Sequence, residues 1–542
     1  MRRWCVRLVA AASGLLLVLS PSAVAVAGPD REATAVVDAL LSGRSDNAGE
    51  TVFWVVLRAQ ADLSGATRLR DRVVKATHVR RALMAHAEGS QAGLRRWLAE
   101  RGAETESFWI TNALRVTGDA ALVEELATRS DVSHLLADRR FALPRVAEET
   151  ARSAEAASVA AVQWNVSRVG ADRVWNQFGV RGEGIVVAGI DSGVQYDHPA
   201  LVNSYRGRRA NGTFDHNYNW YTPVSFYCPT AAPCDQYEHG THTMGTVVGR
   251  DADGAHHTGV APGVKWIAAA GCPFRYCSPQ TLLSAGQWAL APTDLNGQNP
   301  RPDLAPDVIN NSWGENGFNA LWQPMVTSWV NAGIFPVFSN GNSGPACGTP
   351  GSPGYYSQSY SVGSLDSNDL VSDFSSRGPG ENGDVKPDVT APGRDVLSTL
   401  PGGQYGHRSG TSMAAPHVTG SVALLWSAAP ALDGDIAATK AALDDAAIDV
   451  NDVTCGGSAD NNNVYGEGRL DAYAAVSAAP RANLGVLHGQ FSSTATAQPL
   501  NDVVITLDGP LHRVSVSGMD GGYKFDRLLP GTYTYTLEKW GY

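Results

Sequence analysis

The sequence has no surplus of positive charge: 42 lysines and arginines stand against 53 aspartates and glutamates, a formal net charge of −11 at pH 7. Because nucleic-acid-binding domains depend on clustered lysine and arginine, this balance argues against a nucleic-acid partner. Hydrophobic residues make up 43% and charged residues 18% of the chain, as in soluble globular proteins. With 542 residues, the chain is too long for one hydrophobic core, so we expect several domains.

Long apolar runs are also missing, apart from one at the N-terminus. Leu8–Leu19 is largely apolar, follows Arg2, Arg3 and Arg7, and precedes the small residues Ala25-Val26-Ala27. This pattern predicts a signal peptide over residues 1–27, since the run is shorter than the ~20 apolar residues that span a bilayer. A retained N-terminal anchor is the alternative. We expect a secreted, extracellular protein with no transmembrane segment after signal removal.

Cysteine is scarce, and its spacing excludes the commonest zinc sites. Of seven cysteines, Cys5 lies in the predicted signal, which leaves an even number. Exported chains use such cysteines in disulfides, whereas zinc sites need paired Cys-x-x-Cys spacing that this chain lacks. Many pairings are open. The favoured set joins the two pairs that are close in sequence and, by elimination, the remaining two cysteines: Cys228–Cys234, Cys272–Cys277 and Cys347–Cys455.

Residues 28–147 have the pattern of a small α+β domain. Strand and helix signals alternate in the order β-α-β-β-α-β, which implies a sheet covered by two helices on one face. The expected strands are 51–57, 108–110, 113–116 and 132–136, and the expected helices are 68–101 and 120–128. In the longer helix, the candidate buried residues are Val73, Val74, Leu83, Met84, Leu94 and Leu98. Residues 148–162, rich in Ala, Glu and Ser, read as a cleavable linker.

Residues 163–480 have a different pattern, in which short apolar runs alternate with helix candidates. This alternation predicts an α/β domain with a parallel sheet and helices on both faces. The expected strands are 185–190, 264–270, 307–310 and 334–338, and the expected helices are 239–248, 279–289, 319–331, 411–427 and 436–447. Functional residues of such sheets gather beyond the carboxyl ends of the strands. Residues 481–542 contain only strand and turn signals and predict a small β-sandwich.

Three short motifs in the α/β domain carry the chemistry. They are Gly189-Ile190-Asp191-Ser192-Gly193, Glu238-His239-Gly240-Thr241-His242 and Gly410-Thr411-Ser412-Met413-Ala414-Ala415-Pro416-His417. Taken singly, Asp191 could cap a loop, His239 could be a core histidine and Ser412 a helix N-cap. Together they supply the carboxylate, imidazole and hydroxyl that acyl transfer by an activated serine requires.

In these motifs the chain resembles the subtilisin-like serine proteases, the subtilase family. The stretches Asn310–Gly314 and Tyr465–Ala472 look most like the bacillopeptidase F branch. The resemblance implies a catalytic triad of Asp191, His239 and Ser412, a serine endopeptidase that cleaves polypeptides through an acyl-enzyme, and no cofactor for the chemistry.

The resemblance also implies the residues around the triad. It gives the oxyanion hole to Asn342, not to its neighbour Asn340, and the substrate-binding strand to Ser312, Trp313 and Gly314, with Gly341. Asn342 could instead be a turn residue. Trp313 could instead be part of the core.

The flanking domains also have family counterparts. Residues 28–147 resemble a propeptide that acts as intramolecular inhibitor and chaperone, so we expect a self-processing zymogen. Residues 481–542 resemble an incomplete carboxypeptidase regulatory-like domain. A structural calcium ion is an open alternative at Asp251-Ala252-Asp253-Gly254, although the metal ligands stay unassigned. A catalytically silent scaffold that binds peptides or surfaces, or a processing protease with few targets, are the competing interpretations.

Overall fold

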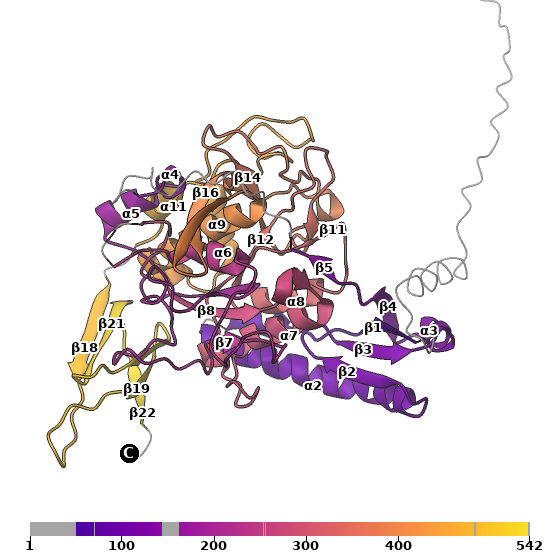
Figure 1. Ribbon diagram of the computed structural model, residues 1–542, viewed down its shortest axis with the longest axis horizontal. Helices are drawn as coiled ribbons and strands as arrows, with labels where there is room; N and C mark the ends of the chain where they lie inside the picture. The colour runs from indigo at the N-terminus through magenta and orange to yellow at the C-terminus, as the bar shows by residue number, and fades with distance from the viewer. Residues whose placement is uncertain are drawn as a thin grey trace, which may run out of the picture.

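The computed structural model describes residues 50–69, 71–143, 162–252, 254, 256–481 and 484–539. The predicted signal peptide and residues 148–161 of the predicted linker lie outside the described residues. The chain forms three units, and both the N-terminal unit and the C-terminal strands lie below the central one in Figure 1. Among the described residues, no helix has the length and apolar character needed to cross a membrane.

The central unit is built on a seven-stranded parallel sheet, which confirms the predicted fold class. Its strand order is β15-β14-β12-β10-β6-β8-β7, and all paired neighbours run parallel. The strands are β6 (Val186–Asp191), β7 (Trp220–Tyr221), β8 (Lys265–Ala270), β10 (Val308–Asn311), β12 (Phe335–Ser339), β14 (Tyr360–Leu365) and β15 (Val389–Pro392). Near-complete burial on both faces explains the apolar runs of β6, β8 and β12.

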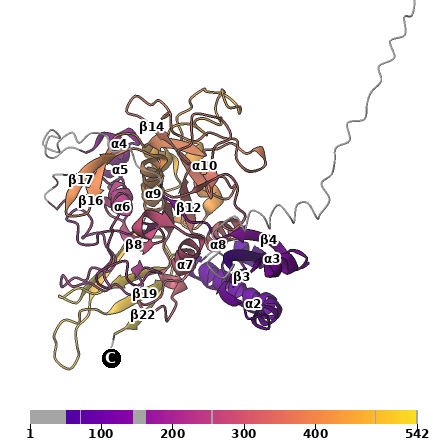
Figure 2. The same ribbon diagram turned by 45° about the vertical axis from the view of Figure 1, so that its right-hand side comes forward.

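Helices cover both faces of this sheet, as Figure 2 shows. On one face α6 (His239–Val248) and α9 (Thr411–Ala428) pack together with α5 (Ala171–Phe178), α10 (Ile436–Asp444) and α11 (Ala472–Ala478). On the other, α7 (Pro279–Leu290) and α8 (Gln323–Asn331) join a second core cluster. The predicted bounds of α6 are confirmed at both ends, whereas α8 begins at Gln323 instead of residue 319. Every residue of α9 is buried, and the helix carries no charged side chain of Asp, Glu, Lys or Arg.

The N-terminal unit has the predicted β-α-β-β-α-β order. Its antiparallel sheet β2-β3-β1-β4 comprises β1 (Thr51–Leu57), β2 (Glu104–Phe108), β3 (Ala113–Gly118) and β4 (Val132–Ala137), with helices α2 (Arg72–Ala99) and α3 (Ala120–Ala127). Two predictions for α2 are wrong: Val74 is 49% and Met84 38% exposed. The buried stripe instead follows Ala76, Val79 and Leu83, because only residues three or four apart share a helix face.

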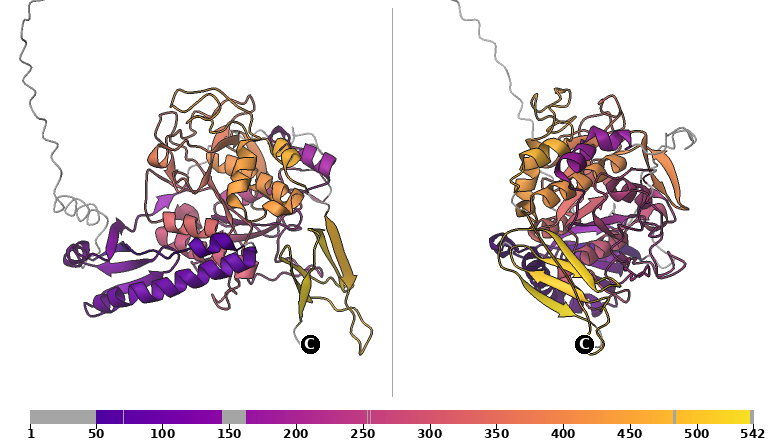
Figure 3. Two further views of the ribbon diagram at one scale, coloured as in Figure 1. Left: turned by 180° about the vertical axis from the view of Figure 1, so that it is seen from behind. Right: turned by 90° about the vertical axis from the view of Figure 1, so that its left-hand side faces the viewer.

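The C-terminal unit consists of two small antiparallel sheets, seen from two sides in Figure 3. Strands β18 (Gly485–Gln490) and β21 (Gly522–Leu528) form one, and β20 (Arg513–Val516), β19 (Val504–Asp508) and β22 (Thr534–Glu538) form the other. A core that includes Ile505, Leu507 and Phe525 holds them together.

All three predicted disulfides are present: Cys228–Cys234, Cys272–Cys277 and Cys347–Cys455. They close very different lengths of chain, with sequence separations of 6, 5 and 108 residues. A cross-link that closes a longer loop removes more entropy from the unfolded chain.

Removing the long-range disulfide is therefore expected to cost the most stability. In the chain-entropy account, Cys347→Ala/Cys455→Ala loses about 5 kcal/mol and Cys272→Ala/Cys277→Ala about 2 kcal/mol. Denaturant unfolding of both double variants, in a Ser412→Ala background, measures the difference. Equal losses would contradict the chain-entropy account.

Candidate active site

The three motif residues lie at the ends of buried elements that pack on one another. Asp191 is the last residue of β6, His239 the first of α6, and Ser412 the second of α9. They are 1%, 2% and 1% exposed. Because α6 packs against both β6 and α9, residues far apart in sequence are collected at the carboxyl end of the sheet, where functional residues were expected.

Asp191 and His239 are in direct contact. Nδ1 of His239 donates to Oδ1 of Asp191 at 2.7 Å. The carboxylate also accepts from the Ser192 N–H at 2.7 Å and from the Thr243 hydroxyl at 3.3 Å. Burial disfavours the charged imidazole, but the charge and hydrogen bond of Asp191 outweigh it and raise the pKa of His239 above its usual value. The other ring nitrogen, Nε2, is buried without a hydrogen-bond partner among the described residues.

Ser412 is tied to the predicted substrate strand. Its hydroxyl donates to the Ser312 carbonyl at 3.0 Å, and the Ser312 hydroxyl donates back to the Ser412 carbonyl at 2.9 Å. The second bond has a cause in the sequence. Pro416, four residues later inside α9, has no N–H to offer the Ser412 carbonyl, so Ser312 supplies the missing donor. In this conformation the hydroxyl points to Ser312, and no bond to His239 is present among the described residues.

Asn342 is oriented by the residue before the serine. Its side-chain oxygen accepts from both the N–H and the hydroxyl of Thr411, at 2.9 and 2.8 Å. Its oxygen is turned toward the start of α9, and its NH2 group, a hydrogen-bond donor, has no acceptor among the described residues. Asn340 is fully buried, and its NH2 group donates to the Ser376 carbonyl at 2.8 Å, a structural contact.

The predicted substrate strand follows β10. Trp313 is fully buried and packs against Trp322 and Phe338, which favours the core interpretation of its side chain. A side chain at Gly314 would lie within 3.1 Å of the Ser352 carbonyl. Gly341 has φ +108, a conformation that favours glycine.

Comparison with known proteins decides the family. The sequence profile of the subtilase family (Peptidase S8) matches residues 182–468, more than half of the chain. The chain belongs to the subtilase family. This confirms the resemblance seen in the motifs.

Relatives align over different shares of their length. The chain is 38% identical over 400 residues to Bacillopeptidase F of Bacillus subtilis (strain 168). This match covers 72% of this chain and 27% of that protein. It is 30% identical over 337 residues to Subtilisin E of the same organism, covering 61% of this chain and 75% of that protein. Subtilisin Savinase of Lederbergia lenta is 32% identical over 269 residues, 49% of this chain and 84% of that protein.

The subtilase site contains a second buried carboxylate that sequence reasoning missed. Asp235 accepts from the Ser192 hydroxyl at 2.9 Å and from the N–H groups of Tyr237, Glu238 and Thr241 at 2.8–3.0 Å. It thereby holds the start of α6, including Glu238 in a left-handed conformation with φ 77, against the end of β6. The available signal was an aspartate placed between a cysteine and the histidine motif.

An extended segment of the N-terminal unit lies beside this subtilase site. Strand β5 (Phe141–Ala142) pairs antiparallel with β9 (Tyr276–Cys277), and the Leu143 N–H donates to the Arg275 carbonyl at 2.8 Å. The Leu143 side chain is 1% exposed and joins the core cluster of α7 and Trp313. β9 ends at Cys277, which is joined by a disulfide to Cys272, and the Cys272 N–H donates to the Asp191 carbonyl at 3.0 Å.

No group of metal-binding side chains is found among the described residues. At the suggested calcium segment, the Asp251 carboxylate is already bonded to His256 and to the Tyr405 hydroxyl, at 2.7 and 2.5 Å. Asp253 lies outside the described part of the chain. The metal ligands therefore stay unassigned.

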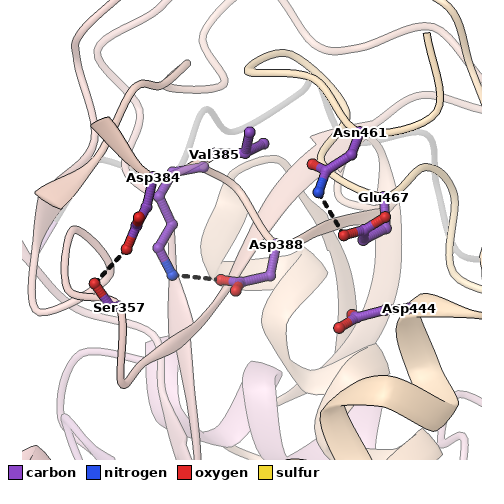
Figure 4. A pocket seen from close by; sticks show the side chains of 8 residues that line it. Ser357, Asp384, Val385, Asp388, Asp444, Asn461 and Glu467 are labelled. Atoms are coloured by element: carbon purple, nitrogen blue, oxygen red, sulfur yellow. Dashed lines mark hydrogen bonds and ion pairs between the residues drawn. The ribbon is translucent and has the colours of Figure 1, made fainter. Parts of the chain in front are cut away.

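A separate acidic cavity of about 240 Å³ lies away from the triad motifs, shown in Figure 4. Four of its lining carboxylates are Asp384, Asp388, Asp444 and Glu467. Lys386 neutralises Asp388 at 2.6 Å. Burial, with the charges of Asp388 and Glu467, raises the pKa of Asp444 to about 7.

Because protonation of Asp444 is favoured in the folded state, its contribution to stability is present below its unfolded pKa of 3.8 and is lost as pH rises through about 7. Asp444→Asn keeps a neutral partner for the Tyr360 hydroxyl. We expect this variant to be more stable than the parent at pH 8.5, by at most about 4 kcal/mol, and the gain to shrink toward pH 4. Thermal unfolding across that range measures it, and a pH-independent difference would contradict the assignment.

Proposed function

We propose that this protein is a secreted serine endopeptidase that cleaves polypeptides through an acyl-enzyme on Ser412. The observation that carries the proposal is the buried 2.7 Å contact between His239 and Asp191. It lies at the carboxyl end of the sheet, where α9 begins. The names of the relatives, Bacillopeptidase F and Subtilisin E, support it. The match covers 27% of the length of Bacillopeptidase F.

The geometry suggests the role of each group. The Ser412 hydroxyl turns from the Ser312 carbonyl toward Nε2 of His239, which takes its proton as the oxygen attacks the scissile carbonyl. Asp191 holds the Nδ1–H tautomer and stabilises the imidazolium that forms. The proton passes to the leaving amine, and water then releases the acyl group by the reverse steps.

The developing oxyanion needs donors that are fixed before the reaction. We assign this role to the NH2 group of Asn342 and to the Ser412 N–H. Thr411 keeps the Asn342 oxygen turned away from the reacting carbonyl. An extended substrate would pair with the backbone of Ser312–Gly314 and beside Gly341.

The N-terminal unit is proposed to be a propeptide over residues 28–147 that inhibits the enzyme until the linker 148–162 is cut. Its β5 strand pairs with β9, an edge that an extended substrate would use. Residues 163–480 would then be the catalytic domain and 481–542 an accessory β domain, after removal of a signal peptide over residues 1–27.

Ser412→Ala tests the activity directly. We expect the variant to fold, to stay uncut between residues 143 and 162 and to digest no casein, because the nucleophile is gone. The wild-type chain should shorten over time and digest casein, as followed by mass spectrometry and peptide release. If a folded wild-type chain does neither, a peptide-binding scaffold replaces the protease.

Thr411→Val tests the positioning of Asn342. The substitution keeps the shape of the side chain but removes the hydroxyl that donates to Asn342. We expect kcat to fall about tenfold with little change in KM, because one hydrogen bond to the amide remains. Asn342→Ala should cost more, about 10²–10³ in kcat, the size measured for such a loss in subtilisin. Equal effects on KM and kcat would contradict a role confined to the transition state.

A further inference from the structure

Four charged side chains, from all three units, meet near the amino ends of the central strands. This end of the sheet is opposite to the one that holds the triad motifs. Arg72 begins α2 of the N-terminal unit, Asp307 precedes β10, Asp433 follows the short helix Pro430–Leu432, and Arg513 begins β20 of the C-terminal unit. The N-terminal and C-terminal units both lie below the central unit in the two views of Figure 3. We call these four residues the three-unit charge cluster.

The cluster is closely paired. Arg72 contacts Asp307 at 2.8 Å and approaches Asp433 at 4.0 Å. Arg513 contacts the other oxygen of Asp433 at 3.1 Å. Asp433 therefore lies between two guanidinium groups that belong to different units of the chain.

These charges are nearly removed from water, with side-chain exposures of 14%, 2%, 6% and 12% for Arg72, Asp307, Asp433 and Arg513. Charges so deeply buried are strongly unfavourable unless they are paired. Burial raises the pKa of Asp307, and the charge of Arg72 opposes that rise. The pairs therefore decide whether this junction is stable.

Arg72 binds in a site formed by residues of the central unit. Its guanidinium also donates to the carbonyls of Ala305 and Pro306, at 3.2 and 3.0 Å. Its aliphatic stem lies against Gly333 and Gly434, where an added Cβ would be in ordinary van der Waals contact with Arg72 Cγ, at 3.5 and 3.7 Å.

We propose that Asp433 is a shared anion through which the C-terminal unit weakens the hold of the catalytic unit on the N-terminal unit. When Arg513 is present, Arg72 binds next to the carboxylates of Asp307 and Asp433 and the guanidinium of Arg513. Without Arg513, Arg72 meets the same two carboxylates with one positive charge fewer beside them, although the buried Arg206 still interacts with Asp307, and the carboxylates attract Arg72 more strongly.

The same arrangement lowers the cost of release. When Arg72 leaves, Asp433 keeps Arg513, and Asp307 keeps the Val186 N–H, which donates to it at 2.6 Å. Resting on the proposed zymogen function, this coupling means that docking of the C-terminal unit favours departure of the cut propeptide.

Hydrogen exchange tests the coupling in the uncut, full-length Ser412→Ala chain, where maturation plays no part. Arg72→Gln should speed exchange in the amides of α2 about tenfold, because local opening no longer breaks the ion pair. Arg513→Gln should slow the same amides about threefold. Arg101→Gln is the matched control: it breaks an ion pair with Glu125 that lies within the N-terminal unit, and should leave the first turns of α2 unchanged.

Asp433→Asn identifies the shared anion. In that background, Arg513→Gln should no longer alter exchange in α2. The proposal is overturned if Arg513→Gln leaves α2 unchanged or speeds its exchange, or if its effect persists with Asn at position 433. In the active chain, the lag before casein digestion should shorten with Arg72→Gln and lengthen with Arg513→Gln. A chain that never matures would overturn the proposed function, whereas the exchange result would still decide the coupling.

Discussion

The buried contact between Asp191 and His239 is the constraint on which the site depends. A carboxylate and an imidazole taken out of water are strongly unfavourable unless they are paired or hydrogen-bonded. This places the end of β6 and the start of α6 at hydrogen-bond distance. Asp235 reinforces the junction by binding the backbone of the turn before α6 and the Ser192 hydroxyl. The relative placement of Asp191 and His239 is thus a consequence of pairing in the core.

The serine side of the site rests on helix α9. Pro416 leaves the Ser412 carbonyl without its helical partner, and the Ser312 hydroxyl takes that place, so Ser412 and the segment that follows β10 are fixed relative to each other. Thr411 orients Asn342 by two hydrogen bonds. In the motif around Ser412, Thr411, Ser412 and Pro416 therefore each have a different structural role.

Much of this was predictable from the sequence, because apolar runs and motifs report local environment. The parallel sheet, the bounds of α6 and the two short disulfides follow from such local signals, whereas Cys347–Cys455, with a sequence separation of 108 residues, was reached by elimination. The burial of Trp313 and the exposure of Val74 do not follow from local signals, since both depend on which neighbours the fold supplies. The three-unit charge cluster was missed for the same reason: its members are distant in sequence, and no local pattern marks them. Asp235 is different, because Tyr237, Glu238 and Thr241 are local partners and only its contact with Ser192 is distant in sequence.

The central claim is that Ser412 is a nucleophile activated by His239. The most direct measurement is the mass-spectrometric location of the adduct formed by a fluorophosphonate, a reagent that captures activated serines. The account predicts a single adduct on Ser412, lost in His239→Ala although the variant remains folded. Labelling elsewhere, absence of labelling in a folded wild-type chain, or equal labelling of the His239→Ala variant would contradict it.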